Sequence, residues 1–364
     1  MAPLSSTPQW FTPVMGTAIL ATACAAVPLD SRILDLVGAT AWALAVTLLA
    51  AAAIHAAVAY RCDRGLLSRE LADPRIAPFF GAPPMAILAV GSATFTAAPG
   101  LAQTSVATAI DLSLWLVGTV LGLVVAVTIP ARQFTSHRVG VADASPTWLL
   151  PVVTPMVSAA TGASLVDRVP HEMVAHGLAW ACLAMAGAAG FAAALTTGAL
   201  WWRLAHHQHD DAATAPALWM VLGPLGQSVT AAAMLALHAP QALPSLAGIL
   251  SPVAILIGVP TLGFAVLWLC ICAAVTRRVS HGPLPYAMSW WAFTFPVGTL
   301  VTGASGIAAL TGSRALGALA VAFLALLLAG WATSAWGTVR AMLARRSNEP
   351  VLASPAERAA TYAI

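Results

Sequence analysis

Apolar residues recur along this chain in long, continuous runs. Ten such runs are separated by charged or Pro/Gly-rich breaks, and each has about the 20 residues that a helix needs to cross a bilayer core. They cover residues 9–28, 33–60, 78–98, 106–129, 147–166, 172–200, 217–238, 248–275, 285–310 and 315–343. Because the runs are continuous instead of alternating, they predict helices and not barrel strands. We therefore expect an all-α membrane protein with ten transmembrane helices.

The breaks between the runs are mostly short, and none has the composition of a soluble domain. The pattern therefore predicts one transmembrane domain over residues 1–345, followed by a cytoplasmic tail over residues 346–364. The first run is interpreted as a retained helix and not as a cleaved signal peptide, because no basic residue precedes it and Pro13 lies inside it.

Composition and charge agree with a membrane location. The chain is 60% hydrophobic and only 8% charged, against about 25% charged residues in soluble domains. All 16 basic residues are arginines, and only Arg32, Arg168 and Arg314 fall on one predicted side of the membrane. Since positive charge is retained on the cytoplasmic side, both termini are predicted to be cytoplasmic. Contact with membrane lipids is expected, and no basic groove with interleaved aromatic residues indicates nucleic-acid binding.

Proline recurs with a regular spacing in the odd-numbered runs. The positions are Pro13, Pro84, Pro155, Pro224 and Pro296, with separations of 71, 71, 69 and 72 residues. The strings around them are also alike: TPVMGT, PPMAIL, TPMVSA, GPLGQS and FPVGTL. The chain therefore reads as five copies of a helical hairpin.

An interior proline removes a helix hydrogen bond and bends the helix, so the freed carbonyl groups, such as that of Gln9, need protein or water as partners. If five bent helices form an inner ring with quasi-fivefold symmetry, these groups line a central pore while the straight helices face lipid. The alternative is that each bend packs against a neighbouring helix.

The polar residues near the prolines are neutral. No Asp, Glu, Lys or Arg lies in the middle of the five predicted inner helices, which weakens a pump or a tightly proton-coupled carrier. Hydroxyl and amide groups are candidates for lining an anion path. They are Thr17, Thr154, Ser158, Thr161, Gln227, Ser228, Thr230, Thr294 and Thr299. The alternative is that these hydroxyls bond to the backbone of their own helix.

Enzymatic chemistry has no candidate residues in this sequence. Paired carboxylates, a metal triad and an activated nucleophile are all missing from the helices, so we expect no enzyme, no catalytic residue, no cofactor and no bound metal. The string HHQHDD at residues 206–211 is interpreted as a solvated loop. His55 and His176 are candidates for titrating groups near a pathway, and the alternative is that each is a hydrogen-bonded packing residue.

Four strings resemble the tellurite-resistance/dicarboxylate transporter family, which includes plant slow-type anion channels, malate permeases, sulfite efflux pumps and bacterial tellurite-resistance proteins. They are WFTPVMGT at residues 10–17, WLLPVVTPMVSAATG at 148–162, GPLGQS at 223–228 and WWAFTFPVGT at 290–299. The resemblance implies five hairpins around a pore in each subunit, and a homotrimer.

In channels of this family a phenylalanine just before the proline of the ninth helix plugs the pore. The matching position here is Phe295, and the alternative is that neighbouring Phe293 occupies the path. We therefore expect an anion channel or exporter of the bacterial cytoplasmic membrane. Its expected cargo is a small anion: a C4-dicarboxylate such as malate, sulfite, chloride or nitrate. The alternative is a proton-coupled carrier of monoanionic organic acids, or a tellurite or sulfite efflux transporter.

Overall fold

The computed structural model describes residues 6–207, 212–280, 284 and 286–348, and every regular element in this part is helical. Ten long α-helices are present, together with the short α3 (Leu66–Ala72). The long helices are α1 (Phe11–Ala26), α2 (Arg32–Cys62), α4 (Ala82–Ala97), α5 (Ser105–Thr135), α6 (Leu149–Ala163), α7 (Glu172–His206), α8 (Leu222–His238), α9 (Ala247–Val279), α10 (Phe295–Thr311) and α11 (Arg314–Asn348).

These ten helices coincide with the ten apolar runs, whereas α3 was not predicted from the sequence. Among the described residues, eight helical spans are long and apolar enough to cross a membrane. Helices α1 and α6, of 16 and 15 residues, are not among them. The chain is thus a multi-pass membrane protein. Most of the predicted tail, residues 349–364, lies outside the described residues, and residues 346–348 continue α11.

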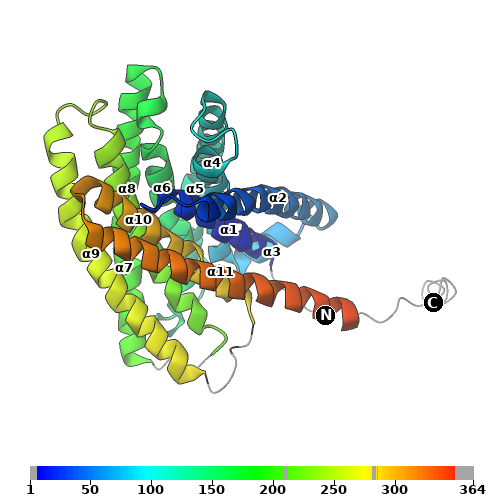
Figure 1. Ribbon diagram of the computed structural model, residues 1–364. Helices are drawn as coiled ribbons and strands as arrows, with labels where there is room; N and C mark the ends of the chain where they lie inside the picture. The colour runs from blue at the N-terminus through cyan, green and yellow to red at the C-terminus, as the bar shows by residue number, and fades with distance from the viewer. Residues whose placement is uncertain (1–5, 208–211, 281–283, 285, 349–364) are drawn as a thin grey trace, which may run out of the picture.

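Five helices form a closed inner ring. Along the ring, α1 packs against α4, α4 against α6, α6 against α8, α8 against α10, and α10 against α1. The helix that follows each member packs on its outside, so that α2, α5, α7, α9 and α11 form an outer layer (Figure 1). The inner helices are almost entirely buried, whereas the outer helices expose many apolar side chains. This difference is expected when the surroundings of the outer layer are lipid.

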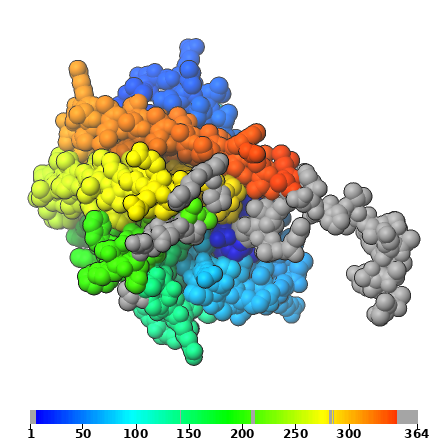
Figure 2. Space-filling view, turned by 90° about the horizontal axis from the view of Figure 1, so that it is seen from below, coloured from blue at the N-terminus to red at the C-terminus, as the bar shows by residue number. Residues whose placement is uncertain are grey.

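The surface view agrees with this layering. In Figure 2 the orange α11 and the yellow α9 lie on the outside of the molecule, and dark blue N-terminal residues are visible near the centre of the face.

The prolines lie at a junction between two helix types. A short 3-10 helix precedes each inner helix: η1 (Thr7–Trp10), η2 (Ala77–Gly81), η4 (Pro146–Trp148), η6 (Ala215–Val221) and η7 (Met288–Phe293). Pro13, Pro84, Pro224 and Pro296 then fall in the first turn of the α-helix, where a missing N–H costs little.

The expectation of interior kinks is therefore corrected for four of the five positions, and only Pro155 lies inside its helix. In α6 the proline that lies in the first turn is Pro151. The carbonyl of Gln9 is also not left without a partner, because it accepts a hydrogen bond from the Thr12 hydroxyl at 2.8 Å.

Candidate functional site

Three cavities follow one another along the inner ring. The first, which we call the arginine vestibule, has a volume of about 910 Å³ and lies where the 3-10 helices meet. Its lining includes Arg75, Arg138, Asp143, Trp148, Arg203 and Met288. Three arginines against one aspartate give it a net positive charge of two. A positive, concave entrance raises the local concentration of anions.

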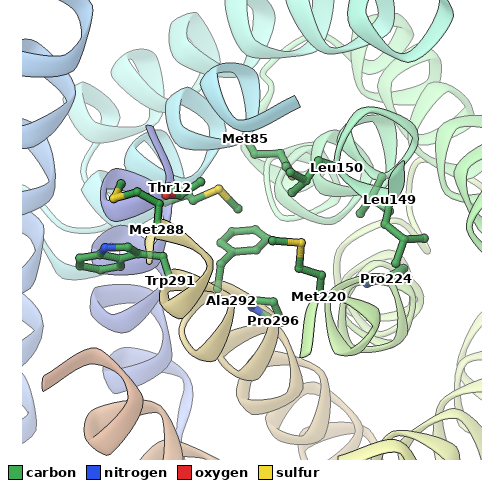
Figure 3. A pocket seen from close by; sticks show the side chains of 14 residues that line it. Thr12, Met85, Leu149, Leu150, Met220, Pro224, Met288, Trp291, Ala292 and Pro296 are labelled. Carbon is green, nitrogen blue, oxygen red and sulfur yellow. The ribbon is translucent and has the colours of Figure 1, made fainter. Parts of the chain in front are cut away.

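The second cavity, the central apolar cavity, has a volume of about 40 Å³. All five inner helices contribute to it through their first turns. Its lining includes Thr12, Met15, Met85, Val153, Pro224 and Phe295. Met220 and Met288 belong to both this cavity and the arginine vestibule, so the two adjoin. Figure 3 shows labelled side chains converging on this space from different helices.

Polar atoms are turned away from the central apolar cavity. Thr12 lines it, but the Thr12 hydroxyl donates to the carbonyl of Gln9. Trp291 also lines it, but its indole Nε1 donates to Thr338 of α11 at 3.1 Å. An apolar space of this size gives a dissolved ion nothing to replace its hydration shell.

Phe295 lines the central apolar cavity. It is the first residue of α10, directly before Pro296, and only 4% of it is exposed. The neighbouring Phe293 lies elsewhere: its ring packs edge-on against Trp219 at 4.9 Å between centroids, and its backbone lies against Gly330 of α11. Of the two phenylalanines considered from the sequence, the structure thus brings only Phe295 to the axis of the ring.

The third cavity, the hydroxyl cavity, has a volume of about 270 Å³ and lies further along the same five helices. Its lining includes Thr22, Ser92, Thr161, Gln227, His238 and Ser305. From Met15 to Thr22 is seven residues, which corresponds to about 10 Å along a helix. The three cavities are therefore stacked in order: arginine vestibule, central apolar cavity, hydroxyl cavity.

Only some of the residues predicted to line a pore reach these cavities. Pro224, Phe295 and Pro296 line the central apolar cavity, and Thr161, Gln227 and Thr230 line the hydroxyl cavity. In the part of the chain that the structure describes, the remainder line none of the three. They are Pro13, Thr17, Pro84, Thr154, Pro155, Ser158, Ser228, Thr294 and Thr299.

Two of the predicted hydroxyls bond to the outer layer. Thr17 accepts a hydrogen bond from Trp331 of α11, and Thr154 donates to the carbonyl of Gly122 in α5 at 2.9 Å. The others, which include Thr161 and Thr230, donate to a carbonyl within three or four residues, as Ser158 does to Thr154 at 3.3 Å. Ser228, Thr294 and Thr299 do the same. Such back-bonding was the alternative considered from the sequence.

The two histidines considered from the sequence lie outside the described cavities. His55 is exposed on α2, with its ring centroid 6.3 Å from that of Trp10. His176 lies on α7, and its Nδ1 is 2.7 Å from the carbonyl oxygen of Ala242. The histidine that does line a cavity is His238, at the end of α8, and sequence reasoning did not single it out.

Sequence reasoning also missed Asp111. This residue lies in the outer helix α5, is 1% exposed, and neither carboxylate oxygen has a hydrogen-bond partner among the described residues. It packs against Gly91 of α4, where a Cβ would lie 2.5 Å from Asp111 Oδ1. The available signal was a single acidic residue within an apolar run. Within the described residues, no cluster of His, Cys, Asp or Glu is suited to hold a metal ion.

Comparison with known proteins gives consistent matches. A family model described as voltage-dependent anion channel matches residues 5–339. The chain is 29% identical over 197 residues to sulfite efflux pumps of Trichophyton rubrum and of Arthroderma otae, and each alignment covers 52% of both proteins. It is 26% identical over 193 residues to an uncharacterized transporter of Methanocaldococcus jannaschii, covering 51% of this chain and 52% of that protein. The matches thus span about half the length of these relatives.

Proposed function

Because this chain belongs to the voltage-dependent anion channel family, we propose that it conducts small anions along the axis of its inner ring. The family assignment confirms the resemblance to tellurite-resistance/dicarboxylate transporters, whose members are channels or transporters and not enzymes. The observation that carries the proposal is the stacking of three cavities inside one ring of five helices.

The proposed path begins in the arginine vestibule, where the net positive charge attracts anions. It then passes Phe295 and enters the hydroxyl cavity. The conformation described here is closed in this proposal, because the central apolar cavity is only about 40 Å³ and its Thr12 hydroxyl and Trp291 indole N–H are bonded elsewhere. Opening requires the Phe295 ring to move, which would let water and ions enter together.

The proposed cargo is a small inorganic or organic anion. Sulfite is supported by the two fungal relatives, which are sulfite efflux pumps, while malate, chloride and nitrate follow from the wider family resemblance. We further propose that all ten long helices cross the bilayer. In that arrangement α1 and α6 are completed by η1 and η4, which bring them to about the required length.

The proposed orientation places the arginine vestibule and both termini in the cytoplasm, as the arginine distribution predicts. The proposed location is the cytoplasmic membrane of a bacterium, and the proposed assembly is the homotrimer implied by the family resemblance. The predicted division into a membrane domain over residues 1–345 and a cytoplasmic tail over residues 346–364 is retained in this proposal.

The experiment that tests the proposal is anion flux in liposomes that contain the purified full-length chain. Malate, sulfite, chloride and nitrate are compared for the wild type and for Phe295→Ala. We expect the variant to raise flux at least about tenfold, which corresponds to ~1.4 kcal/mol of barrier. Phe293→Ala is the matched control. Phe293 is not part of the described lining of the central apolar cavity and packs instead against Trp219 and Gly330. Unchanged flux in a correctly folded Phe295→Ala protein would contradict the gate.

A proton-coupled carrier is the second candidate, and one observation favours it. His238 lines the hydroxyl cavity, and its Nδ1 lies 2.8 Å from Asp167 Oδ2, so a titratable pair adjoins the proposed path. Flux driven by an imposed pH gradient at zero membrane voltage would support the carrier. Flux that follows voltage and ignores the pH gradient would support the channel.

A further inference from the structure

The hydroxyl cavity contains two buried polar side chains with unused hydrogen-bonding capacity. Gln227 is 3% exposed and Ser305 is 8% exposed, and both line the cavity. Gln227 Oε1 and Ser305 Oγ have no hydrogen-bond partner in the described protein. Since the large majority of buried polar side-chain atoms are hydrogen-bonded, these two atoms indicate a polar guest in the cavity.

Neighbouring hydroxyls in the same cavity are already engaged. Thr230 donates to the carbonyl of Gly226 at 2.9 Å, and Thr302 donates to the carbonyl of Thr299 at 3.1 Å. The two threonine oxygens also lie 2.8 Å from each other. Gln227 of α8 and Ser305 of α10 differ from these threonines, because Gln227 Oε1 and Ser305 Oγ are buried beside the cavity without a hydrogen-bond partner among the described residues.

The chemistry of the two free groups restricts the ligand. The Gln227 amide offers two N–H donors and one carbonyl acceptor, and the Ser305 hydroxyl can donate or accept. A ligand that only accepts hydrogen bonds, such as chloride or nitrate, leaves the carbonyl of Gln227 unpaired. A ligand that has both an ionised oxygen and an O–H group satisfies the donors and the acceptor together.

The charges around the cavity favour a ligand with a single charge. No Asp, Glu, Lys or Arg is found among the described residues that line it. Near its mouth, Asp167 accepts a hydrogen bond from Arg168 Nε at 3.1 Å and contacts His238 at 2.8 Å. The Arg168 guanidinium also lies 4.9 Å from the ring centroid of Phe95. A dianion would thus enter a largely uncharged space without a dedicated cation, which is costly.

We propose that Gln227 and Ser305 form a binding site for a monoanionic oxyanion that retains an O–H group. Hydrogensulfite and a half-protonated dicarboxylate belong to this class. The inference rests on the proposed function in one respect only: the path through the ring is what brings an anion to the site.

The test compares hydrogencarbonate with nitrate, which are planar monoanions of similar size that differ by one O–H group. Thermal unfolding of the purified full-length chain is followed while each sodium salt is titrated at constant pH and ionic strength. A ligand that binds the folded state raises the midpoint. We expect hydrogencarbonate to act at lower concentration than nitrate. In Gln227→Leu and in Ser305→Ala, about tenfold more hydrogencarbonate is expected for the same shift.

The matched control is Ser228→Ala. Ser228 is the next residue on α8, donates to the carbonyl of Leu225 at 2.8 Å, and is not part of the described lining, so its variant is expected to titrate as the wild type does. Equal titrations for the wild type and both site variants, or equal effects of the two anions, would overturn the site. Binding is measured without conduction, so the outcome is independent of the Phe295→Ala flux that tests the proposed function.

Discussion

The indole Nε1 of Trp331 donates a hydrogen bond to the hydroxyl of Thr17 at 3.0 Å. These residues are 314 positions apart, and the bond joins the last long helix, α11, to the first helix of the inner ring, α1. Thr17 is completely buried, and its hydroxyl faces the outer layer at this contact. A residue predicted from the sequence to line a pore is thus placed where the first and fifth hairpins meet.

This contact predicts the effect of Thr17→Val. Valine has a similar shape but cannot accept the hydrogen bond, so the indole N–H of Trp331 loses its partner. We expect the free energy of unfolding to fall by about 1 kcal/mol, with the anion selectivity unchanged. The checks are thermal unfolding in detergent and the flux ratio of malate to chloride. An altered ratio with normal stability would place Thr17 on the anion path instead.

Helices α8 and α10 approach each other closely at Gly226. A Cβ at this position would lie 2.5 Å from the carbonyl carbon of Thr299 and 2.6 Å from the amide nitrogen of Leu300. Because these are backbone atoms, Gly226→Ala has to push the two helices apart. We expect it to lower the free energy of unfolding by about 1–3 kcal/mol or more.

The matched control for this change is Gly263→Ala in α9, where a Cβ meets no atom within 4 Å. Alanine is a better helix former than glycine, so this control is expected to be neutral or slightly stabilising. Thermal unfolding and the yield of folded protein compare the two variants. Wild-type stability of Gly226→Ala would contradict the close approach.

From the positive charge of the arginine vestibule we predict that the rate of anion flux depends on salt concentration. Arg75→Gln and Arg138→Gln each remove a positive charge from its lining. We expect each to lower anion flux about threefold at low ionic strength, because the vestibule concentrates anions electrostatically. Near 1 M salt, where the screening length is about 3 Å, the difference from wild type should largely disappear.

Arg61→Gln is the comparison for the vestibule variants, since Arg61 lies in the last turn of α2 and is not part of the described vestibule lining. Liposome flux at two salt concentrations separates the variants. If Arg61→Gln reduced flux as much as Arg75→Gln does, local attraction by the vestibule would not be the cause.

Glu70 connects the N-terminal segment to α2, and we predict that changing it destabilises the fold. Its carboxylate is buried and accepts hydrogen bonds from the Thr7 backbone N–H at 2.7 Å and from the Tyr60 hydroxyl at 2.8 Å. In Glu70→Gln one acceptor oxygen becomes an amide donor, so one of these bonds is lost. We expect the free energy of unfolding to fall by about 1–3 kcal/mol. Thermal unfolding measures this, and the exposed Glu172→Gln should change it by less than about 1 kcal/mol. Equal effects of the two changes would contradict the role of Glu70.

The candidate site was only partly predictable from the sequence. The family resemblance led to Phe295, which the structure places beside the central apolar cavity. Gln227 was singled out for its polarity near a proline, and it lines the hydroxyl cavity. Ser305 and His238 were not singled out, because they lie nine and fourteen residues beyond the prolines of their helices. Candidate residues were chosen because they lie close to a proline, and this criterion does not select residues that line the half of the proposed path farther from the prolines.

The sequence by itself determined the ten long helices and their grouping into five hairpins. Both can be found along the chain without knowing any tertiary contact. A bilayer requires about 20 consecutive apolar residues, and the repeat is visible in the spacing of prolines such as Pro13 and Pro84. Only the tertiary structure decided which side of each inner helix faces the axis. Each residue turns a helix by about 100°, so the direction of a hydroxyl such as that of Thr17 depends on how neighbouring helices pack. The rotation of each inner helix about its own axis is set by contacts between distant parts of the chain, such as the hydrogen bond from Trp331 to Thr17. It cannot be predicted from a local sequence pattern.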